Sequence, residues 1–208
     1  MDEHAPDRAP FTEVSEFNAR SIRGIVRAVI DVKSWIENPP SVDQVRPACC
    51  PACAVPSRPI GSGLLLHGHG LRSRQLWGPP QPHATSEIRL FNGRRHQCQR
   101  CGAVTMVLPT EALTKRLYSA ASIAWTLALF GIALLSPVEI RRLVSPQRIW
   151  GFAAARGWAT IFRWAAAAAE GHLFGCVRPS PPQWPARKVA ERAAATVAAR
   201  ATPHAYLT

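Results

Sequence analysis

Short apolar runs separated by polar and glycine-rich segments fill residues 46–109. The runs lie at residues 64–67, 72–77, 87–91, 94–98 and 104–108, and each has the length of a β-strand. Gly68, Gly70 and Asn92-Gly93 interrupt them and predict turns. The pattern therefore predicts a small, loop-rich β module whose apolar core is too small to fold without a staple such as a metal.

The apolar period becomes helical in residues 110–171. Residues 117–138 carry no charge, and Pro137 and Pro146 are each suited to the first turn of a further helix. Gly157 predicts a turn before another helix that begins at Ala159. We expect helices within 117–138, at 137–144, at 147–155 and from 159 onward.

The two ends of the chain have weaker patterns. Ile22, Val26, Val29 and Ile30 have helical spacing within residues 14–36, so residues 1–45 are expected to form an arm or an accessory helix. Residues 178–185 hold four prolines and predict a stiff linker, and the Ala- and Arg-rich residues 186–201 predict a final helix.

Positive charge is concentrated after residue 45. The chain of 208 residues has a formal net charge of +12 and a pI near 10.7. Residues 1–45 are net acidic, whereas residues 46–116 and 117–208 are both strongly basic. Such a field favours a polyanionic partner, either nucleic acid or an anionic membrane surface.

Two CxxC pairs carry the clearest chemical signal. Each such turn places two thiolates about one tetrahedral edge apart, so Cys50, Cys53, Cys98 and Cys101 could complete the shell of a structural Zn²⁺. No secretory signal is visible, so a cytoplasmic chain is expected. In such a chain, paired cysteines are interpreted as metal ligands in preference to disulfides. Cys49 remains an alternative to Cys50, and redox pairs are a weaker interpretation because neither pair lies in a βαβ setting.

Arginines accompany the cysteine region. We expect Arg72, Arg74, Arg94 and Arg95 to lie on or beside the strands and to contact phosphates, which gives salt-dependent affinity more than sequence choice. A merely solvated charged face is the competing interpretation.

Residues 159–164 have the pattern of a recognition helix. Ile161 and Trp164 share one helical face, while Thr160 and Arg163 point elsewhere. An apolar packing face with Thr and Arg directed outward suits a helix that reads a DNA groove. An ordinary helical bundle with Trp164 in its core would give the same pattern.

The uncharged residues 117–138 are also long enough for a membrane span. Several Ser and Thr residues lie in the run, and basic pairs flank both of its ends, which departs from the usual one-sided bias. We do not expect a membrane partner, but a membrane-anchored small protein with a cytosolic zinc-binding module stays the alternative function.

The combined motifs resemble the zinc-ribbon and helix-turn-helix N-terminal regions of bacterial insertion-sequence transposase-like proteins. The residues that carry the resemblance are Cys50-Pro-x-Cys53, Leu66-His67-x-His69-Gly70, Arg94-Arg95-His96-Gln97-Cys98-x-x-Cys101-Gly102, Tyr118-Ser119 and Arg163-Trp164. The resemblance implies DNA binding in transposition. The carboxylate-bearing nuclease domain of such proteins is missing, because after Trp164 only Glu170 and Glu191 are acidic.

Together these observations predict an α+β chain in four parts. Residues 1–45 form the arm, 46–109 the zinc ribbon, 110–171 the helix-turn-helix, and 172–208 the Pro-rich linker and last helix. We expect a cytoplasmic, non-enzymatic protein that binds double-stranded DNA. A second copy of the chain and a separate transposase catalytic protein are further candidate partners, and an RNA-binding ribbon would fit the same charge.

Overall fold

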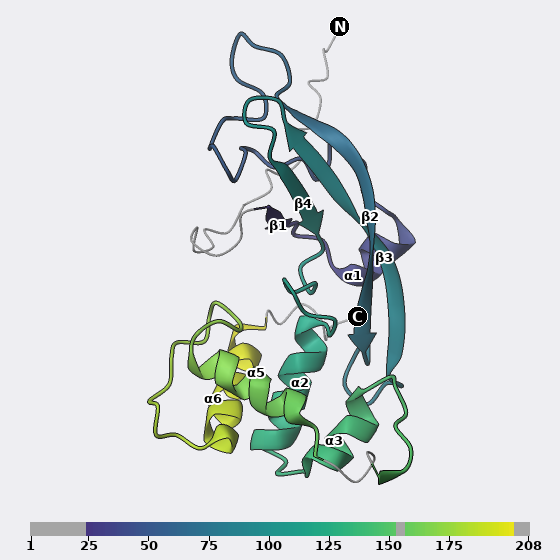
Figure 1. Cartoon of the computed structure of the whole chain (residues 1–208), viewed down its shortest axis with the longest axis vertical. Helices are drawn as coiled ribbons and strands as arrows, with labels where there is room; N and C mark the ends of the chain where they lie inside the picture. Colours follow the sequence, from purple (N-terminus) through teal and green to yellow (C-terminus); the bar gives the residue numbers. More distant parts are fainter. Residues whose placement is uncertain (1–23, 153–156, 202–208) are drawn as a thin grey trace, which may run out of the picture. The chain divides into compact units, whose positions relative to one another are not determined.

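The computed structural model describes residues 24–152 and 157–201, and it has a mixed α+β fold (Figure 1). The chain forms two compact units. One contains residues 1–72 and 92–110, and the other contains residues 73–91 and 111–208. Each is treated below by itself as the sheet unit and the helical unit, within the described residues.

A four-stranded sheet with the order β1-β4-β3-β2 organises the sheet unit. Its strands are β1 (Ile25–Arg27), β2 (Leu66–Gly78), β3 (Glu87–Cys98) and β4 (Val104–Leu108), of which β2 and β3 continue into the helical unit. β3 pairs antiparallel with β4 and aligns Arg94 with Val107, whereas β1 pairs parallel with β4 and aligns Ile25 with Met106. The four cysteines therefore lie on connections to an ordered sheet.

A short helix, α1 (Val32–Glu37), packs on the sheet unit. Its N-cap is Asp31, whose carboxylate accepts a hydrogen bond from the backbone N–H of Ser34 at 2.9 Å. Trp35 is 1% exposed, and its indole N–H donates to the carbonyl oxygen of Asn92 at 3.0 Å. One buried aromatic residue thus fixes this helix to strand β3.

Residues 25–31 correct the prediction of a helix over 14–36, of which residues 14–23 lie outside the described part. Ile25 and Val26 form β1 instead, because strand β4 offers them a hydrogen-bonding edge and β-branched side chains suit a strand. Among the described residues of this range, helix begins only at Val32, the first residue of α1 (Val32–Glu37). The helical spacing of the apolar residues predicted a helix, but pairing with the distant strand β4 determines the observed structure.

The predicted turns at Gly68, Gly70 and Asn92-Gly93 were also wrong. These residues lie inside β2 and β3, so two longer strands replace four short runs. At Gly68 a Cβ would lie 2.9 Å from a methyl of Val42, and at Gly93 it would lie 2.6 Å from a methyl of Leu108. Both glycines allow close approach of a neighbouring segment instead of a reversal of the chain.

Four of the five described helices lie in the helical unit. They are α2 (Ala120–Gly131), α3 (Pro137–Val144), α5 (Ala159–Ala169) and α6 (Ala186–Arg200) (Figure 1). Ser119 caps α2 by accepting from the N–H of Ser122, and Ser136 forms a capping box with Glu139 before Pro137 begins α3. Local sequence signals therefore set where α2 and α3 begin.

One apolar core joins these helices. It contains buried residues from all four, among them Leu127, Ile140, Ile161 and Ala190. The approach of α2 to α6 is close at Gly131, where a Cβ would lie 2.2 Å from the backbone nitrogen of Glu191. Glycine and the alanines of α6 allow the two helices to pack at this short distance.

Tyr118 lies at the centre of an aromatic cluster in the same unit. Its ring meets those of Trp77, Trp158 and Trp164 edge to face, with centroids 5.7, 5.6 and 5.1 Å apart. Trp77 belongs to β2, and its backbone N–H donates to the carbonyl oxygen of Leu117 at 2.8 Å. The end of the β2–β3 hairpin is thereby part of the helical core.

The run at 117–138 contains a helix as expected, whereas two other segments of the helical unit differ from expectation. The uncharged run 117–138 holds the 12-residue helix α2 and then a break before Pro137, and none of the described helices is both long and apolar enough to cross a membrane. Residues 147–151 are not helical, residue 152 is helical, and residues 153–155 of the helix predicted at 147–155 lie outside the described part. The Pro-rich segment packs on the unit, since Ser180 N–H donates to the carbonyl of Ala169.

Candidate metal centre

The four CxxC cysteines come from two loops of the sheet unit. Cys50 and Cys53 lie in a turn that follows an isolated antiparallel bridge between Cys49 and Pro56. Cys98 ends strand β3, and Cys101 lies in the turn that leads into β4. Residues that are distant in sequence are brought together because β3 ends beside the first loop.

Both turns have the same backbone pattern. The N–H of Cys50 donates to the carbonyl of Val55, and the N–H of Ala54 donates back to the carbonyl of Cys50, each at 2.8 Å. The second turn repeats this at 2.9 Å, with Cys98 to Ala103 and Gly102 to Cys98.

The residue four positions after the first cysteine is left-handed in each turn. Ala54 has a φ of 56° and Gly102 a φ of 71°. The repeated conformation makes the two turns equivalent ligand carriers, although only one of them has a glycine at the left-handed position.

The four sulfur atoms form a compact cluster. All lie within 4.8 Å of one another, the Sγ atoms of Cys50 and Cys101 are 3.7 Å apart, and those of Cys53 and Cys98 are 3.8 Å apart. A tetrahedral ion with Zn–S bonds of about 2.3 Å has S–S edges of about 3.8 Å. The six thiols of the chain form no disulfide. The four cysteines thus have a geometry that could hold a metal ion.

The environment of the thiols is uneven. Burial alone would raise the pKa of Cys98, but backbone N–H groups of Cys101 and Arg100 outweigh it and lower the pKa to about 7. The pKa of Cys101 instead rises to about 12; a bond from the N–H of Ala103 lowers it, but burial and hydrogen bonds to neighbouring sulfurs raise it more. The Cys98 thiolate is therefore favoured near neutral pH, whereas the Cys101 thiol stays protonated in the absence of a cation.

The side chains around the cluster are apolar but few. Cys50 and Cys98 are buried together with Val55 and Leu66, while Cys101 is exposed. This small core agrees with the expectation that the loops need a staple.

The other candidate ligands lie apart from the four sulfurs. Cys49 is exposed and is not part of the cluster, so Cys50 is the ligand that the geometry favours. His67 contacts the carbonyl of Leu64, and His96 is fully buried with its Nε2 3.2 Å from the carbonyl oxygen of Val42. Burial lowers the pKa of His96, so its imidazole is neutral at pH 7. Cys176 lies in the helical unit.

The arginines expected to contact phosphates differ in exposure. Arg72 is exposed on β2, and Arg74, Arg94 and Arg95 are half-buried. The Nε of Arg94 donates to the carbonyl of Pro40 at 2.7 Å, so part of its guanidinium stabilises the fold of the sheet unit. Arg72 is the cleaner candidate for a contact with an external phosphate.

Thr160 and Arg163 lie one turn apart on α5, away from the core. Arg163 is exposed, and its guanidinium donates to the hydroxyl of Thr160 at 2.9 Å, while Ile161 and Trp164 are buried. Residues 145–158 separate α3 from α5, which is longer than the three- to four-residue turn of a compact helix-turn-helix. The prediction of inward and outward faces on this helix is confirmed.

Two features of the molecule were not predicted from the sequence. One is the left-handed residue in each cysteine turn, for which Gly102 was the available signal. The other is a pocket beside α3 lined by three arginines and Trp150, for which the signal was the density of Arg residues around an aromatic residue in 141–150. Comparison of the chain with family models, curated proteins and solved structures finds no match.

Proposed function

We propose that this protein is a zinc-dependent DNA-binding protein, related to transposases, that binds duplex DNA without cleaving it. The cluster of four sulfurs is the observation that carries the proposal, because its two sulfur–sulfur contacts of 3.7 and 3.8 Å match the edge of a zinc–thiolate tetrahedron. The zinc is structural, since four thiolates leave no open position for a reacting water.

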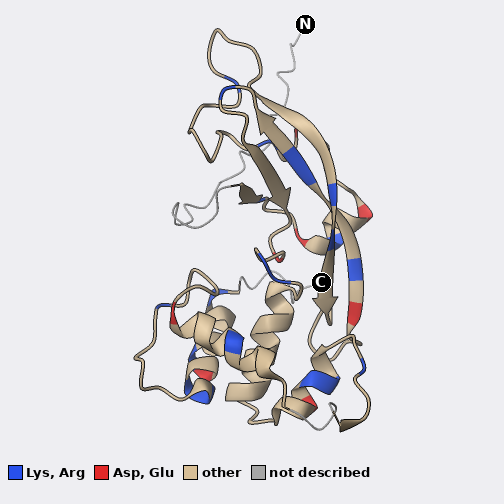
Figure 2. Cartoon of the chain, in the orientation of Figure 1, with Lys and Arg blue, Asp and Glu red and all other residues tan. Residues whose placement is uncertain are grey.

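The charge distribution supports a nucleic-acid partner. Basic residues greatly outnumber acidic ones in residues 46–208, and Figure 2 shows Lys and Arg along the strands as well as on the helices. Within the described residues, Arg46, Arg58 and Arg89 each form an ion pair with a carboxylate. The remaining positive field would attract a phosphate backbone.

The helical unit supplies a candidate reading element in α5. The hydrogen bond from Arg163 to Thr160 holds the guanidinium at the helix surface, and the buried Trp164 anchors the opposite face. In our proposal Arg163 and Thr160 contact base edges in the groove, while Arg72 contacts a phosphate.

Binding without cleavage follows from the acidic residues. Two-metal DNA cleavage needs several carboxylates that hold the ions in one site. After α5 the sequence offers only Glu170 and Glu191, and Glu170 accepts a contact from His172 at 3.1 Å. In our proposal a separate transposase catalytic protein supplies the nuclease in a transposition reaction.

Fluorescence anisotropy with a labelled random-sequence duplex tests the proposal. The zinc-loaded protein should bind with an affinity that falls steeply and log-linearly with salt, and Arg72→Ala should reduce that slope by about 1. After selection from random duplexes, Arg163→Ala should cost about 1–3 kcal/mol on the selected sequence and much less on random DNA. Absence of duplex binding at low salt, or a salt-independent affinity, would refute the proposal.

A further inference from the structure

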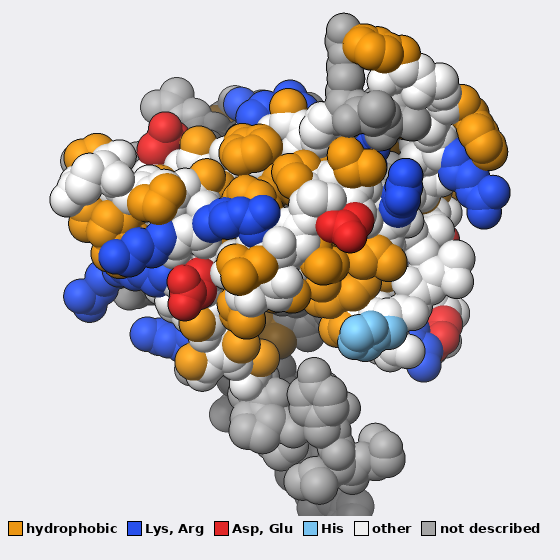
Figure 3. Space-filling view, turned by 90° about the horizontal axis from the view of Figure 1, so that it is seen from below, with side chains coloured by type: hydrophobic (Ala, Val, Ile, Leu, Met, Phe, Trp, Pro, Cys, Tyr) orange, Lys and Arg blue, Asp and Glu red, His pale blue; other side chains and the backbone are white. Residues whose placement is uncertain are grey.

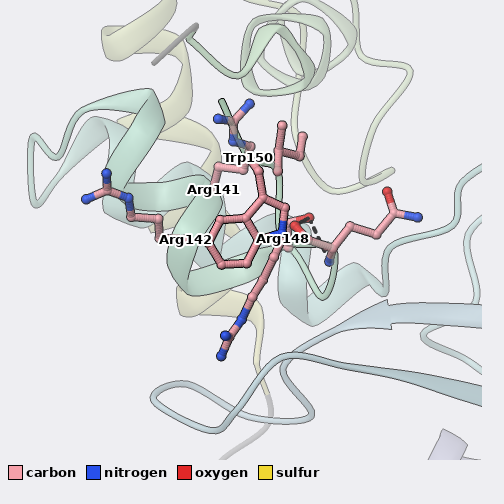
Figure 4. A pocket seen from close by; sticks show the side chains of 7 residues that line it. Arg141, Arg142, Arg148 and Trp150 are labelled. Atoms are coloured by element: carbon pink, nitrogen blue, oxygen red, sulfur yellow. Dashed lines mark hydrogen bonds between the residues drawn. The ribbon is translucent and has the colours of Figure 1, made fainter. Parts of the chain in front are cut away.

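A pocket of about 360 Å³ lies at the C-terminal end of α3 and the segment that follows it (Figure 4). Seven residues line it: Arg141, Arg142, Ser145, Gln147, Arg148, Ile149 and Trp150. Its volume is at the lower end of the range for small-molecule sites and suits one nucleotide. None of the lining residues was assigned to the zinc site or to α5.

Three guanidinium groups line the pocket without an acidic residue among its walls. Arg141 and Arg142 lie in the last turn of α3, where they also offset the negative end of the helix dipole. Arg148 lies beyond the helix, so the dipole does not explain its position. Glu139, one turn before Arg142, is held by the capping box at Ser136, which lowers the pKa of its carboxyl.

Trp150 adds an exposed aromatic surface to these cations. Its side chain is 77% exposed, whereas Trp35 and Trp164 are 1% and 3% exposed. Figure 4 shows the indole beside the arginine side chains, with Arg142 and Arg148 extending on either side of it. A large apolar ring left in water beside guanidinium groups is the arrangement that binds stacked bases with their phosphates.

We propose that this pocket binds a nucleotide of a single-stranded nucleic acid, with Arg142 and Arg148 on the phosphate and the base stacked on Trp150. A duplex cannot fill it in this way, because the faces of paired bases are covered by the neighbouring base pairs. The site is separate from the duplex contacts proposed for Arg72 and α5, and it does not depend on them.

An anionic lipid surface is the competing occupant. Apolar and basic side chains are intermixed on the face of Figure 3, and Phe152, near Trp150 in sequence, is 79% exposed. A membrane, however, would take up both aromatic residues as one apolar patch, whereas the pocket includes Trp150 and not Phe152. The arginines also line the hollow itself. Both observations favour a discrete ligand with an anionic group.

The experiment measures binding of the full zinc-loaded chain to a labelled oligothymidylate of about 12 nucleotides. Trp150→Ala should weaken this binding by between about 5-fold and 150-fold, and Trp150→Phe should retain most of it because phenylalanine also stacks. Arg148→Ala should weaken it as well. The matched controls are Phe152→Ala for an exposed aromatic residue and Arg178→Ala for an exposed arginine outside the pocket, and both should stay within about twofold.

Parallel titrations with a short duplex and with vesicles of phosphatidylcholine and phosphatidylserine separate the outcomes. Trp150→Ala should leave duplex affinity unchanged, so a protein that fails to bind duplex DNA can still pass this test. Equal losses in Trp150→Ala and Phe152→Ala together with vesicle binding would overturn the proposal in favour of a lipid surface. Oligothymidylate affinity that is unaffected by Trp150→Ala would overturn it outright.

Discussion

Removal of the metal should unfold the two cysteine loops and leave the helical unit folded. The cluster joins residues 48–65 to the turn after β3, where the N–H of Gln99 also donates to the carbonyl of Leu65 at 2.8 Å. Among the described residues, none of the four sulfurs contributes to the core of the helical unit. Chelation, or the substitution Cys50→Ala, should therefore act locally.

The magnitude follows from the few apolar groups in the loops. Val55 and Leu66 are almost fully buried and together contribute about 3–6 kcal/mol. Ordering the backbone of the two CxxC turns, residues 50–54 and 98–102, costs about 1–2 kcal/mol for each residue, which exceeds that gain. A four-thiolate zinc site supplies about 10–16 kcal/mol of apparent free energy. The metal therefore decides whether these loops are folded.

Hydrogen exchange measured by mass spectrometry is the appropriate assay. In the metal-loaded protein the amides of Cys50, Ala54 and Leu65 are hydrogen-bonded within or between the loops, so they should be protected. Chelation should abolish this protection while peptides from α2, α5 and α6 stay protected. Cys49→Ser and Cys176→Ser are the matched controls, because neither thiol belongs to the cluster.

Metal analysis completes this test, with an expected stoichiometry of one zinc ion in each chain. The reasoning is refuted if the purified protein holds no metal and its loop amides are nevertheless protected. It is also refuted if Cys50→Ala exposes the helical unit as strongly as the loops.

Three further predictions concern the fold and the site. Gly131→Ala should lower the free energy of unfolding of the helical unit by at least about 1–3 kcal/mol in a urea titration, because the new Cβ would meet the backbone of Glu191. The control Gly157→Ala should be near neutral, since the nearest atom to its Cβ would be 4.0 Å away. Gly102→Ala should destabilise the metal-loaded sheet unit by about 1 kcal/mol, because alanine is strained in the left-handed conformation of this position. Ala54→Gly should not destabilise it, because glycine relieves the same strain in the other turn. Equal effects of the two substitutions in thermal unfolding would contradict the equivalence of the two turns. Zinc affinity measured by chelator competition should fall more than about tenfold for each pH unit below 8, because most of the thiols must release a proton to bind the ion. A pH-independent affinity would exclude thiolate ligation.

Several elements could be predicted because their signals are local. The capping residues Ser119 and Ser136 and the helix-starting Pro137 act within one turn, and α2 and α3 begin where these residues indicate. The inward face of α5 was likewise predictable from the period of Ile161 and Trp164. The strand β1 was not predictable, since its hydrogen bonds go to Met106 and Leu108 at the other end of the unit.

The sequence by itself determined the thiolate chemistry of the candidate metal site, because the CxxC spacing fixes two thiolates within one turn wherever that turn lies, but it left Cys49 as an alternative to Cys50. Only the tertiary structure decided that the two turns meet, with Cys50 beside Cys101 and Cys53 beside Cys98. It also decided which arginines remain available, since Arg94 donates to a distant carbonyl and Arg148 lines a pocket with Trp150. The chemistry of a ligand pair depends on residues adjacent in sequence, whereas the exposure of a side chain depends on packing against segments that are distant in sequence.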